Sequence, residues 1–141
     1  MKYLILLLFP ILLLSQNTQY QYFFENAPYN EAICDSLYKL CKNQKNTLQK
    51  AYLGAALIIK SKHVFSIYKK WKNFQKGKKI LEYAVSQNPR SSEIRWIRYC
   101  IQNSIPDVLN YNQNIEEDRI FIQRNGTDKE KDSIITIKLD K

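Results

Sequence analysis

Residues Lys72–Cys100 read KNFQKGKKILEYAVSQNPRSSEIRWIRYC, and this stretch decides the fold of the chain. Its first half carries small or apolar residues three and four apart, which is the period of one face of an α-helix. The pair Asn88-Pro89 ends that helix, because the residue before a proline is pushed out of the helical region. Ser91 or Ser92 then caps a second helix, since a serine side chain accepts hydrogen bonds from free backbone amides. The stretch therefore predicts two helices joined by a proline turn.

The flanking residues extend this pattern to a single all-α domain of four to five helices over residues 28–125. Apolar residues at helical spacing predict a first helix over about 29–42. A second helix begins near Thr47 and is apolar almost all round, as expected of a helix buried between neighbours. The third helix carries Trp71 and Phe74 in its apolar stripe, which predicts that both rings belong to the core.

The last predicted helix is short and follows Asn114. Asn114 is expected to cap it, with Glu117 as the acid of a capping box. The segments outside the domain have no clear helical period. Residues 16–27 are aromatic and polar and are interpreted as an extended arm, and residues 126–141 are interpreted as a flexible tail.

Residues 1–15 have the pattern of a bacterial signal peptide. Lys2 is followed by the apolar run Tyr3–Leu14 and then by Ser15, a small residue at which cleavage is expected. A helix that crosses a bilayer needs about 20 apolar residues, so a retained membrane anchor is the weaker alternative. The sequence therefore predicts an exported protein, periplasmic or secreted, without a stable transmembrane anchor.

The 141-residue chain is basic, with 22 Lys and Arg against 13 Asp and Glu and a net charge of +9. Its lysines concentrate in Lys60–Lys79, where Tyr68, Trp71 and Phe74 lie between them. The candidate surface for an anionic partner consists of Lys69, Lys70, Lys72, Lys76, Lys78 and Lys79. Lysines and aromatic rings can together hold phosphates and stack bases, although lysines also commonly cover a solvated helix face. Among anionic partners, nucleic acid is the least expected.

Arg95 and Arg98 lie three residues apart and share one face of the predicted helix. Two arginines in this arrangement could clamp the carboxylate of a ligand. They could equally form an internal ion pair with Glu82 or with the acidic cluster Glu116–Asp118, which is the interpretation that we favour.

The sequence offers no catalytic, cofactor-binding or metal-binding set. His63 is the only histidine and has no acid or cysteine three or four residues away. Cys34, Cys41 and Cys100 lack the spacing of a zinc site, and they are interpreted as buried apolar residues, with a disulfide to Cys100 as the alternative. The cluster Glu116–Asp118 could bind a divalent cation, but it equally suits a helix N-terminus.

The first half of the opening stretch resembles the second helix of a tetratricopeptide repeat. The matching residues are Gly77, Leu81, Ala84 and Pro89. The resemblance implies a helical hairpin in which small residues let two helices approach closely. No second copy follows at a fixed period, so it implies one hairpin rather than an array of repeats.

Most of the predicted mature chain resembles a group of short exported helical proteins of Bacteroidetes type. The resemblance is carried by Ala51-Tyr52-x-Gly54-Ala55, Gly77-Lys78-Lys79-x-Leu81-Glu82, Glu93-Ile94-Arg95 with Arg98, Pro106–Tyr111, and Ile115–Asp118 with Phe121-Ile122. It implies an all-helical fold and export, and it implies no activity.

Together these observations predict a non-enzymatic exported scaffold or protein-interaction domain of the bacterial cell envelope. The alternative is a binder of an anionic envelope polymer, lipid headgroup or nucleic acid through the basic segment Lys60–Lys79. No cofactor is expected in either case.

Overall fold

A computed structural model describes residues 18–139 of the chain, and the predicted signal peptide lies outside them. This part of the chain is one all-α domain without strands. Residues 18–26 are helical. The elements that follow are α2 (Glu31–Cys41), α3 (Thr47–His63), α4 (Ile67–Gln87), α5 (Ser92–Ser104), the 3-10 turn η1 (Asp107–Leu109), α6 (Ile115–Asn125) and α7 (Asp128–Leu139).

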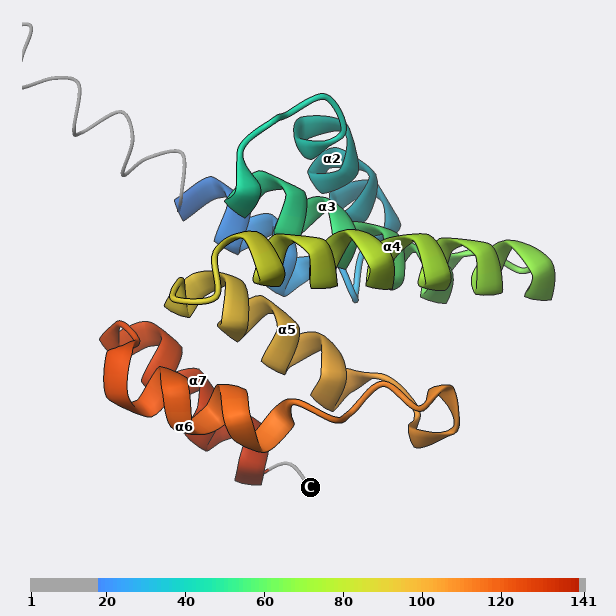
Figure 1. Ribbon diagram of the computed structural model, residues 1–141. Coiled ribbons are helices and arrows are strands. Elements are labelled where there is room, and N and C mark those ends of the chain that lie inside the picture. The colour runs from blue at the N-terminus through green and yellow to red at the C-terminus, as the bar shows by residue number, and fades with distance from the viewer. Residues whose placement is uncertain (1–17, 140–141) are drawn as a thin grey trace, which may run out of the picture.

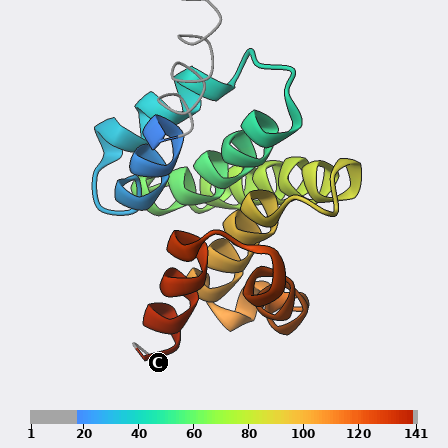
Figure 2. The same ribbon diagram turned by 90° about the vertical axis from the view of Figure 1, so that its left-hand side faces the viewer.

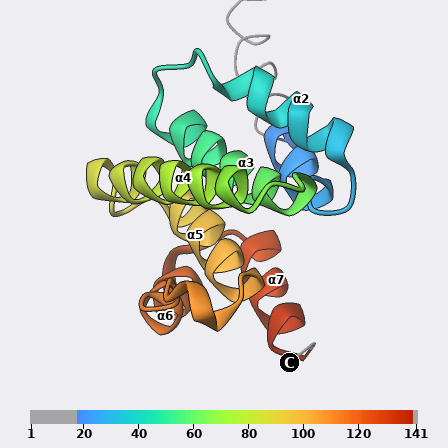
Figure 3. The ribbon, with the colours of Figure 1, turned by 90° about the vertical axis from the view of Figure 1, so that its right-hand side faces the viewer.

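The helices form two groups joined by α5 (Figure 1). Residues 18–26 lie with α2, α3 and α4 at one end of the molecule, and α6 and α7 lie at the other (Figures 2 and 3). Helix α5 contacts α3 and α4 on one side and α6 and α7 on the other. The N-terminal end of α4, green at the right of Figure 1, extends past the helices around it.

Helices α3 and α4 cross at two glycines. A Cβ atom on Gly77 would lie 2.5 Å from the carbonyl oxygen of Gly54, and one on Gly54 would lie 2.7 Å from the backbone nitrogen of Leu81. No side chain fits at either position, so the two backbones are in direct contact. The prediction that small residues let these helices approach closely is confirmed.

Polar side chains cap the N-termini of helices α2 and α5, close to the helix starts predicted from the sequence. Asn30 accepts hydrogen bonds from the amides of Ala32 and Ile33, at 2.9 and 3.2 Å, and begins α2. Ser91 accepts one from the amide of Ile94 and begins α5. These caps satisfy backbone amides that have no partner within the helix. The predicted pair of helices on either side of Asn88-Pro89 is thus confirmed as α4 and α5.

The predicted extended arm is wrong, because residues 18–26 are helical. Tyr20, Phe24 and Ala27 are buried and lie four and three residues apart, which is helical spacing. The ring of Tyr20 stacks on that of Tyr52 in α3, with the ring centres 5.5 Å apart. The ring of Phe24 packs edge-on against that of Trp96 in α5, with the ring centres 5.3 Å apart. Contact with these two rings gives the segment a core to fold onto.

The predicted flexible tail is also wrong over most of its length, because residues 128–139 form α7. Thr127 and Glu130 form a reciprocal capping box: the amide of Glu130 donates to Thr127 Oγ1, and the amide of Thr127 donates to Glu130 Oε2. Ile134 is buried, and Ser133 Oγ accepts a hydrogen bond from Trp96 Nε1 at 2.6 Å. Helix α7 therefore belongs to the domain.

Asn114 stands before α6 as predicted, but its side chain makes no capping hydrogen bond. Its backbone amide instead donates to Gln102 Oε1 of α5, at 3.2 Å. Its side-chain amide lies 3.4 Å from Glu117 Oε2, so Glu117 does not close a capping box on the backbone. The start of α6 is thus held by α5 rather than by its own cap.

Candidate functional site

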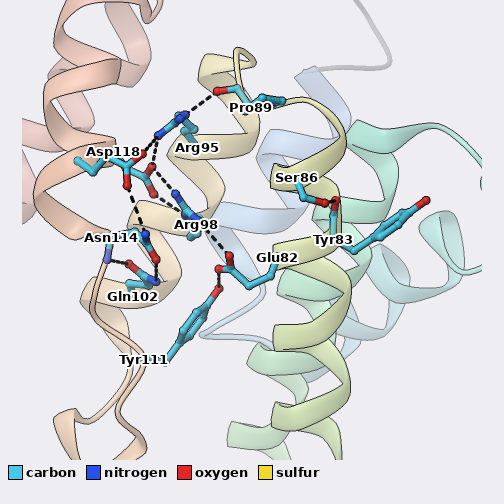
Figure 4. Close-up of polar contacts among 11 residues, drawn as sticks. Glu82, Tyr83, Ser86, Pro89, Arg95, Arg98, Gln102, Tyr111, Asn114 and Asp118 are labelled. Carbon is cyan, nitrogen blue, oxygen red and sulfur yellow. Dashed lines mark hydrogen bonds and ion pairs between the residues drawn. The ribbon is translucent and has the colours of Figure 1, made fainter.

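Arg98 of α5 and Asp118 of α6 form a buried ion pair between the two groups of helices (Figure 4). Arg98 Nε donates to Asp118 Oδ2 at 2.7 Å, and Arg98 Nη2 donates to Asp118 Oδ1 at 2.8 Å. Two parallel hydrogen bonds of this kind are the strongest arrangement an arginine and a carboxylate can make. The exposed fraction is 4% for Arg98 and 0% for Asp118, so water competes little for either group.

Glu82 of α4 completes the coordination of Arg98. Its Oε2 accepts from Arg98 Nη1 at 3.0 Å, and its Oε1 accepts from the hydroxyl of buried Tyr111. Burial alone lowers the pKa of Arg98, but the hydrogen bonds and charges of Asp118 and Glu82 outweigh it, so the pKa is raised. Burial, followed by the contact with Glu82, raises the pKa of Tyr111. Arg98 is therefore charged and Tyr111 is protonated at neutral pH.

Arg95 joins the same cluster one helical turn earlier. Its Nη1 lies 3.0 Å from Asp118 Oδ1 and 2.8 Å from Glu117 Oε1, and its Nε donates to the carbonyl of Pro89 at 2.7 Å. The hydrogen bond from Arg95 lowers the pKa of Glu117. The carboxylate that the two arginines clamp is thus Asp118 of the same chain, and the internal ion pair predicted from the sequence is present.

All three carboxylates of the acidic cluster Glu116–Asp118 form ion pairs with arginines of the same chain. Asp118 and Glu117 bind the two arginines of α5, and Glu116 binds Arg119 one turn further along α6. Within residues 18–139, no group of three His, Cys, Asp or Glu side chains could hold a metal ion.

A second polar network, which the sequence analysis did not predict, links the N-terminal helix to α3 and α5. The hydroxyl of Tyr52 donates to Glu93 Oε1 at 2.5 Å, and Gln21 Nε2 donates to the same oxygen at 3.2 Å. Burial raises the pKa of Glu93, and the two hydrogen bonds oppose this only in part. Glu93 lies in the first turn of α5, and its carboxylate binds side chains of other helices.

His63 and the cysteines have structural surroundings. His63 Nε2 lies 2.8 Å from the carbonyl oxygen of Ala27, which ties the end of α3 to the turn before α2. Cys34, Cys41 and Cys100 are free thiols. Burial raises the pKa of Cys34 to about 11 and that of Cys41 to about 12, so neither is a thiolate at neutral pH.

The lysines of α4 are largely in solvent. Lys69, Lys70, Lys72, Lys76 and Lys79 are exposed. Lys78 is half-buried, and its Nζ lies 4.7 Å from the centre of the Tyr111 ring. Within the described part of the chain, none of these six lysines forms an ion pair with a carboxylate. Their charge is thus available to a partner.

Trp71, predicted to be core, lies on this surface instead, next to Tyr68. Trp71 is 54% exposed and Tyr68 is 71% exposed, whereas Phe74 is buried as predicted. The reason is the extension of α4 past its neighbours, which leaves its first turns without a helix to pack against (Figure 1). We call Phe65, Ile67, Tyr68 and Trp71, with Lys62, Lys69, Lys70 and Lys72, the basic-aromatic surface.

An apolar groove of about 540 Å³ opens beside the basic-aromatic surface. It lies among α3, the start of α4, the end of α5 and η1. Its apolar lining includes Ile58, Ile59, Phe74, Ile101 and Leu109. Four members of the basic-aromatic surface also line it: Lys62, Ile67, Lys70 and Trp71. A second hollow of about 380 Å³ shares Pro28, Ile59, Ile101 and Ser104 with the groove and continues toward α7. Pockets of several hundred Å³ with mostly apolar walls are typical of binding sites.

Comparison with known proteins gives no family model, no curated protein and no solved structure that matches this chain. Among the helices within residues 18–139, none combines the length and the apolar character needed to cross a membrane. The function must therefore be argued from the groove and the basic-aromatic surface themselves.

Proposed function

We propose that the protein is a non-enzymatic exported helical interaction domain of the bacterial cell envelope, and that the groove binds an apolar segment of a partner protein. The observation that carries the proposal is the groove itself, an open apolar site in a domain whose buried arginines and acidic cluster are occupied by internal contacts. Large apolar side chains that remain in water around such a site are typical of interaction surfaces.

Export is part of this proposal and rests on residues 1–15. The tetratricopeptide-like hairpin is also a proposal, for which the supporting feature is the close crossing of α3 and α4 at Gly54 and Gly77. Sequencing the N-terminus of the protein recovered from the periplasm or the medium tests export, since cleavage after Ser15 gives a chain that begins at Gln16.

Filling the groove tests the binding site. Ser104 is exposed and lines both the groove and the second hollow, so Ser104→Trp places a ring in the space without altering the core. A partner is first captured from envelope extract at high salt, and its affinity for the purified protein is then measured. We expect Ser104→Trp to weaken binding at least tenfold and Ser104→Ala to leave it unchanged. Equal affinities for all three proteins would place the partner elsewhere.

The second candidate function is binding of an anionic partner through Lys60–Lys79. It is favoured by one observation: this segment contains eight lysines and no acid, and five lysines of α4 are exposed. Binding to a soluble polyanion such as heparin should weaken steeply with salt, because small ions screen exposed charges. Replacing Lys72, Lys76 and Lys79 by glutamate should abolish it, and undiminished binding by that variant would reject this function.

A further inference from the structure

We propose that the anionic partner of the basic-aromatic surface is a lipid bilayer, and that residues 65–71 insert into its interfacial region. The inference rests on the second candidate function and adds the identity of the partner. It draws on three features of one segment: its exposed apolar side chains, its charge and its position at the tip of the molecule.

The exposed apolar side chains are concentrated in seven residues. Phe65 is fully exposed, Ile67 is 83% exposed, and Tyr68 and Trp71 follow at 71% and 54%. They occupy the loop before α4 and its first turns, which form the projecting end of that helix (Figure 1). They stay exposed in the described part of the chain, and four large apolar side chains within seven residues are a concentration of the kind that marks a binding surface.

Positive charge surrounds these side chains. Lys69 and Lys70 are exposed within the same segment and Lys72 is exposed directly after it. Lys62 Nζ lies 5.5 Å from the centre of the Tyr29 ring, beside the groove. The chain has no aspartate or glutamate between Lys60 and Lys79. Lysine clusters are attracted to anionic headgroups, and their long apolar stems let the ammonium groups stay at headgroup level while neighbours insert.

The combination of groups distinguishes a bilayer from a soluble polyanion. A polyanion would neutralise the lysines, but it would leave Phe65 and Ile67 in water. A bilayer covers both, because tryptophan and tyrosine rings favour the membrane interface and phenylalanine and isoleucine favour the acyl chains below it. The segment presents these four residue types together with lysines, so a bilayer matches the whole surface.

Tryptophan fluorescence can test insertion directly, since Trp71 is half-exposed and the only other tryptophan, Trp96, is buried. Protein processed naturally by the bacterium is titrated with vesicles of phosphatidylcholine, alone or mixed with phosphatidylglycerol. We expect at least tenfold tighter binding to the mixed vesicles, with the emission shifted to shorter wavelength. The shift should be absent from Trp71→Phe, which retains Trp96.

Variants separate insertion from charge attraction. Phe65→Ser with Ile67→Ser should weaken vesicle binding at least tenfold and leave heparin binding unchanged, because no charge is altered. Ile135→Ser is the matched control, since Ile135 is an exposed isoleucine of α7 at the other end of the molecule, and it should bind vesicles as the wild type does. All variants share one N-terminus, so the differences report on the surface alone.

Each other outcome overturns the inference. If the double variant binds vesicles like the wild type, or the emission of Trp71 does not shift, the segment does not insert. If the wild type binds heparin but no vesicles, the bilayer is wrong and the anionic-partner function stands. If it binds neither, both fail.

Discussion

Replacing Arg98 by alanine should destabilise the domain strongly. The change removes two hydrogen bonds to Asp118, of 2.7 and 2.8 Å, and one to Glu82, of 3.0 Å. It also leaves the carboxylate of Asp118 fully buried with one arginine in place of two. Breaking a buried ion pair from one side costs about 3–5 kcal/mol. Because Arg95 still contacts Asp118, we expect a loss of about 3 kcal/mol.

The assay is thermal and urea unfolding followed by circular dichroism. At about 4 °C per kcal/mol for a domain of this size, the melting temperature should fall by roughly 12 °C. Arg119→Ala is the control, because it removes an arginine–carboxylate pair on the surface of α6 and should leave the midpoint nearly unchanged. The double variant Arg98→Ala with Asp118→Ala should lose less stability than the sum of its two single variants.

Two results would refute this reasoning. Arg98→Ala and Arg119→Ala could shift the melting temperature equally, which would mean that burial adds nothing to the Arg98 pair. The effects of Arg98→Ala and Asp118→Ala could also be additive, which would mean that the two side chains do not depend on each other.

Three further predictions concern other parts of the core. Gly77→Ala should destabilise the domain by about 1–3 kcal/mol, because its Cβ would lie 2.5 Å from the carbonyl oxygen of Gly54; an unchanged urea midpoint would contradict the close crossing. The raised pKa of Glu93 means that the folded state favours its protonated form, so its stabilising effect is present below about pH 4.5 and is lost as pH rises through the folded pKa. Glu93→Gln should therefore gain stability relative to the wild type between pH 4 and 7, whereas a pH-independent difference in melting temperature would exclude this. The thiols of Cys34 and Cys41 should react with a disulfide reagent at pH 8 only after denaturant is added, since both are buried with pKa values of about 11 and 12, and rapid labelling of the native protein would show that α2 opens readily.

Local signals allowed the central helices to be predicted from the sequence. Helices α2 to α6 have apolar stripes and clear boundaries such as Asn88-Pro89, and these depend only on neighbouring residues. Helix α7 carried a readable signal in Thr127 and Glu130, which have the spacing of a capping box. Residues 18–26 had helical spacing of their buried residues but no recognised cap, and only contact with Tyr52 and Trp96 explains their burial.

Some features of the candidate sites could also be predicted from local sequence, and others could not. The Arg98–Asp118 pair could be anticipated, because two arginines on one helix face and one acidic cluster left few choices of partner. The contact of Tyr52 with Glu93 joins residues of α3 and α5 that are far apart in the chain, so no local pattern indicates it. The exposure of Trp71 depends on how far α4 extends past its neighbours, and the groove depends on where η1 lies. Both are properties of the assembled helices.

The Arg98–Asp118 pair has a consequence for cooperativity. It lies where α5 meets α6, and Arg98 also binds Glu82 of α4. If α6 and α7 detached while the other helices stayed folded, Arg95 and Arg98 would both lose their hydrogen bonds to Asp118, and the face of α5 that packs on α6 would be exposed to water. We therefore expect the two groups of helices to unfold together, so that the most protected amides of α5 and α6 exchange only through global unfolding.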